Sequence, residues 1–94
     1  MKIIRSQAYI KSLQETMQFI SLDSKERALN FKYQLDTHID NLDNMPFKFR
    51  KSIYFNNDNI RDLIFKGYTI VYKIDTAKES ITIIGLRNTQ EKLS

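Results

Sequence analysis

The 94-residue sequence has no cysteine, one histidine, one proline and two glycines. The lack of cysteine excludes disulfides, thiol nucleophiles and cysteine-based zinc sites, and one histidine cannot build a metal site without unusual help from carboxylates. Gly67 and Gly85 lie too far apart to form a phosphate-binding glycine loop, and neither a metal-ligand spacing nor a nucleophile elbow occurs. We therefore expect no metal and no cofactor, and a reducing setting.

The chain also has no long apolar run. Residues 1–11 lack the apolar stretch of a signal peptide, and no segment is long enough to cross a bilayer. We therefore predict a cytoplasmic protein with no membrane partner. A hydrophobic content of 41% over 94 residues suffices for one core, so residues 1–94 are expected to form a single domain.

The positive charge is concentrated in the second half of the chain. The net charge is +4, and residues 46–87 hold eight basic residues against four acidic ones, whereas the remaining residues hold seven of each. This excess indicates either the solvated face of a slightly basic protein or a surface for a polyanion or an acidic partner.

The first half of the chain follows the period of an α-helix. Residues 2–5 are expected to form a short strand, and residues 7–20 carry an apolar stripe at spacings of three and four. Asp23 and Glu26 have the spacing of a capping box, which predicts that a second helix starts there and stops before Pro46. We expect two long antiparallel helices, whose apolar stripes are Ile10, Leu13, Met17 and Ile20 in the first and Ala28, Phe31, Leu35, Ile39 and Leu42 in the second.

After Pro46 the apolar residues recur with period two, which predicts strands. Residues 47–55 are expected to be extended with one buried face, formed by Phe47, Phe49, Ile53 and Phe55. Strands over residues 60–65 and 68–74 should form a hairpin at Lys66-Gly67, because glycine adopts the positive φ of a tight turn, and residues 81–87 should form another strand. The fold class is α+β, with an N-terminal helical hairpin packed on one face of a small antiparallel β-sheet.

Three cations near the ends of the predicted strands are the first candidate contacts. Arginines such as Arg61 and Arg87 can hold a phosphate through bidentate hydrogen bonds, and Lys66 lies at the hairpin turn. The arginines can equally form ion pairs with Asp58, Asp62 or Glu91. Strand alternation favours core positions for Tyr68 and Tyr72, and the helical period gives His38 a flanking or solvent-facing position. Gly85 fits a bulge, a tight spot under a helix or a close approach of another backbone.

The order of these segments resembles the RelE/ParE superfamily of small bacterial toxins from type II toxin–antitoxin modules. The similar parts are a helical hairpin ending in "LDNMP", then "RKS", then "IRDLIFKGYTIVYKID", then "ITIIGLRN". The resemblance covers nearly the whole chain. It implies a small sheet with two N-terminal helices on one side, in agreement with the periodicity.

The resemblance also implies a function. A toxin of this kind arrests bacterial growth when free, and a co-encoded antitoxin with an acidic or disordered tail neutralises it in a hetero-oligomeric complex. RelE-like members cleave mRNA on the translating ribosome, using cations and a tyrosine or histidine, whereas ParE-like members poison DNA gyrase and have no nuclease site.

The residues of this chain favour the ParE-like branch. RelE-like toxins carry cations where this chain has Asp62 and Thr69, and many family members have a histidine where this chain has Asn88, which cannot act as a general acid or base. The alternatives are a RelE-like endoribonuclease, with Arg61, Lys66, Tyr68 and Arg87 as its catalytic residues and Tyr54 as a second tyrosine, or a small basic nucleic-acid-binding domain. In either toxin reading the target-binding candidates are Lys48, Arg50, Lys51, Arg61, Lys66, Arg87 and Asn88.

Overall fold

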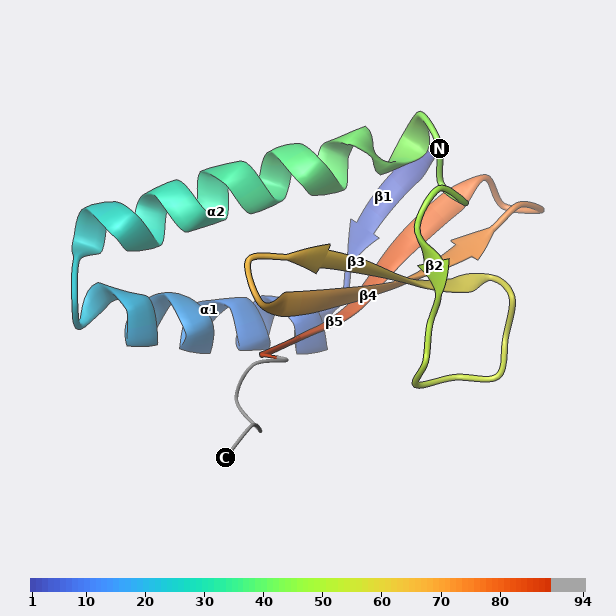
Figure 1. Cartoon of the computed structure of the whole chain (residues 1–94). Coiled ribbons are helices and arrows are strands. Elements are labelled where there is room, and N and C mark those ends of the chain that lie inside the picture. The colour runs from blue at the N-terminus through green and yellow to red at the C-terminus, as the bar shows by residue number, and fades with distance from the viewer. Residues whose placement is uncertain (89–94) are drawn as a thin grey trace.

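The computed structural model describes residues 1–88 of the chain. The elements are β1 (Lys2–Arg5), α1 (Gln7–Ser21), α2 (Lys25–Asp40), the 3₁₀ turn η1 (Asn41–Asp43), β2 (Arg50–Lys51), β3 (Ile60–Phe65), β4 (Tyr68–Asp75) and β5 (Ser80–Asn88). The five strands form one sheet in the order β1-β5-β4-β3-β2 (Figure 1). All neighbouring pairs are antiparallel except β1 and β5, which are parallel. The predicted α+β class and the predicted short strand at residues 2–5 are confirmed. The sheet was expected to be antiparallel, and the parallel pairing of β1 with β5 was not predicted.

Serine side chains cap the N-termini of both helices. Ser6 Oγ accepts a hydrogen bond from the Tyr9 N–H at the start of α1, and Ser24 Oγ accepts one from the Arg27 N–H at the start of α2. The predicted capping box at Asp23 is therefore wrong, because the extended residue before α2 is Ser24. Asp23 instead forms an exposed ion pair with Arg27, which lies four residues later, at 2.6 Å from its guanidinium.

The core lies between the helical hairpin and one face of the sheet, which we call the helical face. Tyr9 is fully buried in it, although the predicted stripe of α1 omitted this residue. The predicted stripe of α2 is buried throughout. The buried residues of this core are Tyr9, Leu13, Phe31, Leu35, Ile39, Leu42, Leu63, Phe65, Ile70, Tyr72, Ile74, Ile81, Ile83 and Leu86.

The opposite face of the sheet, which we call the second face, carries different residues. Strand alternation and register place Asp62, Thr69, Val71 and Arg87 there, because Asp62 pairs with Val71 and Thr69 pairs with Arg87. Asp62, Thr69 and Val71 are buried nevertheless. The sheet is thus covered on both sides, by helices on one and in part by a loop on the other.

That loop is residues 44–59, which we call the aromatic loop. The prediction of a long extended segment with one buried face over residues 47–55 is wrong, since only Arg50–Lys51 forms a strand. Phe47, Ile53 and Phe55 are 44%, 68% and 46% exposed. Two-residue alternation in this segment therefore does not reflect a buried strand face.

Tight connections set the register of β3, β4 and β5. Lys66 and Gly67 both have positive φ, at 50° and 81°, as a two-residue hairpin turn requires. The pairing of β4 with β5 shifts between Val71 and Tyr72, so a β-bulge lies beside Gly85. The turn at Lys66-Gly67 was predicted, and the bulge is one of the three explanations considered for Gly85.

Candidate functional site

Arg61 fixes the aromatic loop to the sheet. Its Nε donates to the Asp58 carbonyl at 2.9 Å, and its NH1 group donates to the carbonyls of Phe47 and Phe49 at 3.2 and 3.0 Å. The guanidinium also stacks 4.9 Å from the centre of the Phe47 ring. These contacts use the planar donor fork of arginine to close both ends of the loop onto β3.

Asp62 holds the same loop from the second face. Its side chain is fully buried, and Oδ2 accepts hydrogen bonds from Arg50 and from the Ile53 N–H, each at 3.2 Å. Its other oxygen, Oδ1, has no hydrogen-bond partner within residues 1–88. Where the RelE-like pattern has a cation, this chain therefore has a buried anion that anchors the loop.

Tyr72 ties the start of the loop to the core. Its hydroxyl donates to the Pro46 carbonyl at 2.7 Å, and burial raises the pKa of this tyrosine to about 12. Burial also raises the pKa of Tyr9 to about 12. Both hydroxyls therefore keep their protons at neutral pH, and Tyr72 acts as a hydrogen-bond donor inside the protein.

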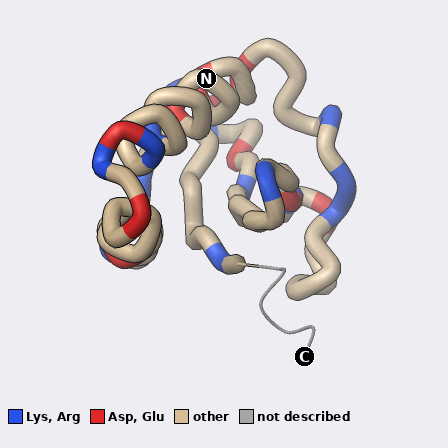
Figure 2. The backbone as a smooth tube through the Cα atoms, turned by 60° about the vertical axis from the view of Figure 1, so that its left-hand side comes forward, with Lys and Arg blue, Asp and Glu red and all other residues tan. Residues whose placement is uncertain are grey.

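The outer surface of the loop alternates aromatic rings with cations. Lys48 Nζ lies 5.2 Å from the Phe49 ring centre, and the Arg87 guanidinium lies 4.5 Å from the ring centre of Tyr54. Residues 44–57 contain no acidic residue. The basic residues of this segment are drawn in blue on one side of the molecule (Figure 2). The contacts of Lys48 and Arg87 with aromatic rings leave the charges of these two side chains available to a partner.

The structure gathers some of the predicted target-binding residues and separates others. Arg50 and Lys51 pair with β3 opposite Asp62 and Arg61, and Lys51 also forms a 3.1 Å ion pair with Asp58. Arg61 is committed to backbone carbonyls, so of the three expected acidic partners it contacts only the backbone of Asp58. The third expected partner, Glu91, lies outside the described residues.

Lys66 and Asn88 lie at the other end of β3, β4 and β5. Lys66 occupies the hairpin turn, with its Nζ 5.5 Å from the Phe65 ring centre. Asn88 ends β5 opposite Tyr68, and both side chains belong to this end of the sheet. The predicted target-binding residues thus form two groups, one on or beside the aromatic loop and one at the hairpin turn. Arg87 lies between them, opposite Thr69 on β4 and stacked on Tyr54 of the loop.

The four residues named for a nuclease do not meet at one point. Arg61 and Lys66 are separated by the length of β3, about 16 Å at ~3.3 Å per residue. Tyr68 pairs with Phe65 and half-buries its ring against Phe31 on the helical face, with ring centres 5.2 Å apart. Arg87 stands on the second face beside Thr69. The four residues are thus spread over both faces of the sheet and both ends of β3.

Two kinds of feature are absent from residues 1–88. They contain no cluster of three or more histidine, cysteine, aspartate or glutamate side chains suited to a metal ion. No helix among them is long and apolar enough to span a membrane. His38 is exposed on α2, with its ring 4.9 Å from that of Phe65, as predicted for a flanking histidine.

Sequence reasoning missed the roles of Asp62 and Arg61 in holding the loop. Arg61 was predicted as a target contact or as an ion-pair partner of nearby acids, and Asp62 as one of those acids. In the structure Arg61 donates to loop carbonyls and Asp62 accepts from Arg50 of the loop. The available clue was that Asp62 alternates with Leu63 and so points away from the helices. That clue indicates a second covered face only once the loop is known to return over the sheet.

Comparison with known proteins agrees with this architecture. The family model described as the ParE toxin of the type II toxin–antitoxin system parDE matches residues 3–93. A solved structure of the chromosomal ParDE toxin–antitoxin system from P. aeruginosa superposes with a TM-score of 0.74 at 12% identity, over 94% of this chain and 95% of that one. None of the curated proteins matches.

The solved structure supports the fold alone, since 12% identity is too low to transfer the roles of individual residues. The family model covers nearly the whole chain, including both helices and all five strands. The chain therefore belongs to the family of ParE toxins of type II toxin–antitoxin systems.

Proposed function

We propose that this ParE-like toxin acts in the cytoplasm on DNA gyrase and arrests growth by poisoning that enzyme. The match of the ParE family model to residues 3–93 is the observation that carries this proposal. Membership of a toxin–antitoxin family also gives the chain a cognate antitoxin as partner. The antitoxin would keep the toxin inactive in a hetero-oligomeric complex.

The geometry of the site supports binding rather than cleavage. Arg61, Lys66, Tyr68 and Arg87 are distributed over both faces and both ends of the sheet. Electrostatic catalysis needs donors that converge on the reacting phosphate, and this arrangement has no such convergence among the described residues. An exposed surface of rings and cations, in contrast, suits the interface with a large partner.

The test is a supercoiling assay with purified chain, gyrase and relaxed plasmid. We expect inhibition of supercoiling and accumulation of cleaved DNA trapped with gyrase. Intact supercoiling at excess toxin, together with new 5′ ends in translated mRNA after induction, would replace this proposal with the RelE-like endoribonuclease. Salt-sensitive binding to naked nucleic acid without either effect would favour the simple binding domain.

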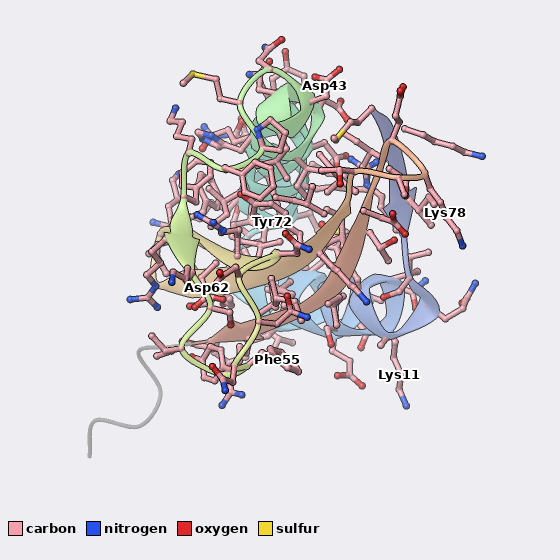
Figure 3. The ribbon with its side chains drawn as sticks, turned by 90° about the vertical axis from the view of Figure 1, so that its right-hand side faces the viewer. Lys11, Asp43, Phe55, Asp62, Tyr72 and Lys78 are labelled. Atoms are coloured by element: carbon pink, nitrogen blue, oxygen red, sulfur yellow. The ribbon has the colours of Figure 1, made fainter. Side chains whose placement is uncertain are left out.

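A pair of charge reversals tests whether the aromatic loop contacts the target. Lys48→Glu changes the exposed surface of the loop, and Lys11→Glu makes the same change on α1, where the side chain points away from the loop (Figure 3). We expect Lys48→Glu to weaken inhibition about tenfold, more at low salt, because charges at a contact steer association. Lys11→Glu should leave inhibition unchanged, and equal effects of the two would place the contact elsewhere.

A further inference from the structure

Gly85 leaves a hollow in the second face of the sheet. It pairs with Val71, so a side chain at this position would stand beside Val71 on that face. A Cβ atom placed on Gly85 meets no atom within 4 Å. The hollow has a volume of about 310 Å³, at the lower end of the range of roughly 300–1,000 Å³ that small-ligand sites occupy. We call it the Gly85 pocket.

The walls of the Gly85 pocket come from three separate parts of the chain. Tyr54 and Phe55 of the aromatic loop form one wall, Ala8 and Ser12 of α1 form another, and Val71 forms part of the floor. In Figure 3 the loop that carries Phe55 lies in front of the sheet. Most of this lining is apolar, so the pocket suits an apolar group and offers few hydrogen bonds to a polar one.

Arg87 supplies a cation at the same place. It lines the pocket and stacks on Tyr54, with 4.5 Å between the guanidinium and the ring centre. Within residues 1–88, no carboxylate forms an ion pair with it. An apolar hollow beside an arginine that has no acidic partner among residues 1–88 fits a large apolar side chain with a carboxylate close to it.

We propose that the Gly85 pocket receives one large aliphatic or aromatic side chain of the antitoxin, whose neighbouring carboxylate pairs with Arg87. The excess of basic residues in 46–87 favours an acidic partner segment. A nucleobase is a poorer occupant, because its polar edges would meet mainly apolar walls. The inference depends on the proposed function only for the antitoxin, and not for gyrase as the target.

Such a contact would act as an anchor of the interface. A single large side chain in a closely fitting pocket, with a charge pair at its rim, is the usual form of a binding hot spot. A stretch of antitoxin that crosses the aromatic loop would thereby hold Tyr54 and Phe55 against the sheet. The antitoxin would then cover part of the loop surface that the toxin presents to its target.

The test is to fill the pocket with Gly85→Leu. The backbone of Gly85 has no positive φ, so leucine can adopt it, and the side chain enters open space. We expect the midpoint of thermal unfolding to rise by a few degrees, since apolar area is buried and a strand glycine is replaced. We expect the affinity for the antitoxin to fall at least tenfold, measured by titration with the protein that the neighbouring gene encodes.

Thr82→Leu is the matched control. Thr82 lies on β5 and on the same face, opposite Lys73, but outside the pocket. Arg87→Gln is the second variant, which removes the cation without filling the pocket. We expect Thr82→Leu to bind the antitoxin like the wild type and Arg87→Gln to bind it several-fold more weakly, with the difference reduced at high salt.

A fragment titration tests the same pocket without the antitoxin. Indole-3-acetate, which joins an aromatic ring to a carboxylate, should shift the amide resonances of Gly85, Val71 and Tyr54 at millimolar concentration, and indole-3-ethanol should do so less. Gly85→Leu should abolish these shifts. If Gly85→Leu lowers stability, the Arg87→Gln titration and the wild-type fragment shifts still decide the result.

Three results would overturn the proposal. The first is wild-type affinity of a stably folded Gly85→Leu variant for the antitoxin. The second is a variant that still binds the antitoxin but no longer inhibits gyrase, which would assign the pocket to the target. The third is binding of a short single-stranded oligonucleotide that Gly85→Leu abolishes, which would assign the pocket to nucleic acid. Failure to inhibit gyrase would refute the proposed function and leave this test unchanged.

Discussion

The two faces of the sheet are covered in different ways. The helical face is buried under α1 and α2 by a continuous set of apolar side chains. The second face is covered in part by the aromatic loop, which a few polar contacts from Arg61, Asp62 and Tyr72 hold in place. The first arrangement gives stability through buried area, whereas the second gives a defined loop conformation with little buried area.

This difference separates the stable part of the molecule from its binding surface. Phe47, Ile53 and Phe55 remain exposed because polar contacts along the loop backbone, and not these side chains, hold the loop. Phe49 is the member of the predicted apolar face that packs against the core, so we expect the loop to open at a lower free-energy cost than the sheet. The helices should therefore determine the free energy of unfolding, and the loop should determine recognition.

The largest expected effect is on the helical face. Leu35 is fully buried in α2, and Leu35→Ala should lower the free energy of unfolding by roughly 2–5 kcal/mol, because the cavity cannot be filled by its neighbours. Leu29→Ala is the matched control, since Leu29 is on the same helix and 65% exposed. Urea denaturation of both variants measures the difference. Equal losses would show that the helices contribute less to the core than their burial indicates.

The helical face is also the part that could be predicted from the sequence. Ala28, Phe31, Leu35, Ile39 and Leu42 recur at the helical period, and all of them are buried. Periodicity is informative there because one side of each helix faces water and the other faces the core. The two strands on either side of Lys66-Gly67 could also be predicted from a local signal, because a tight turn between two alternating segments fixes their register.

The second face could not be predicted in the same way. Alternation in residues 47–55 has the period of a strand, yet the segment folds as a loop because Arg61, Asp62 and Tyr72 bind its backbone. Such contacts join residues 9 to 26 positions apart, and no local pattern reports them. The Gly85 pocket is equally hidden, because three separate segments of the chain form it.

Alkaline pH should lower the free energy of unfolding through Tyr72, whose ring lies in the core of the helical face and whose hydroxyl binds the aromatic loop. Its pKa is about 12 in the folded protein and about 10 in an unfolded chain. Its contribution to stability is therefore complete below about pH 10 and is lost as the pH rises toward 12, by on the order of 2–3 kcal/mol. Tyr72→Phe should remove that part of the pH dependence, as measured by urea denaturation between pH 9 and 12.

Tyr33→Phe is the matched control for this prediction. Tyr33 is 72% exposed on α2, so its replacement should leave the alkaline loss of stability unchanged. Tyr72→Phe should also weaken the hold on the aromatic loop at neutral pH, because the Pro46 carbonyl loses its donor. A pH profile that Tyr72→Phe does not alter would contradict the assignment of the raised pKa to this residue.

The smallest effect on stability, and the most local one, is expected at Asp62. Asp62→Ala removes the acceptor for Arg50 and for the Ile53 N–H. Because Arg50 is about half exposed and Ile53 is exposed, water can satisfy both donors, so the cost should be only about 1 kcal/mol. Hydrogen exchange should accelerate at Ile53 and its neighbours in the loop while the amides of β4 and β5 keep their protection.

Asp62→Asn separates the hydrogen bond from the charge. Asparagine keeps a carbonyl oxygen that can accept from the Ile53 N–H, whereas the ion pair with Arg50 is lost. We expect Asp62→Asn to protect the loop nearly as well as the wild type, because a pair with one half-exposed partner contributes little. Asp58→Ala, which breaks the exposed ion pair with Lys51, should have an equally small effect. If Asp62→Asn instead opens the loop as fully as Asp62→Ala, the charge on Asp62 holds the loop, and the second face is stabilised by its ion pair rather than by its hydrogen bond to the backbone.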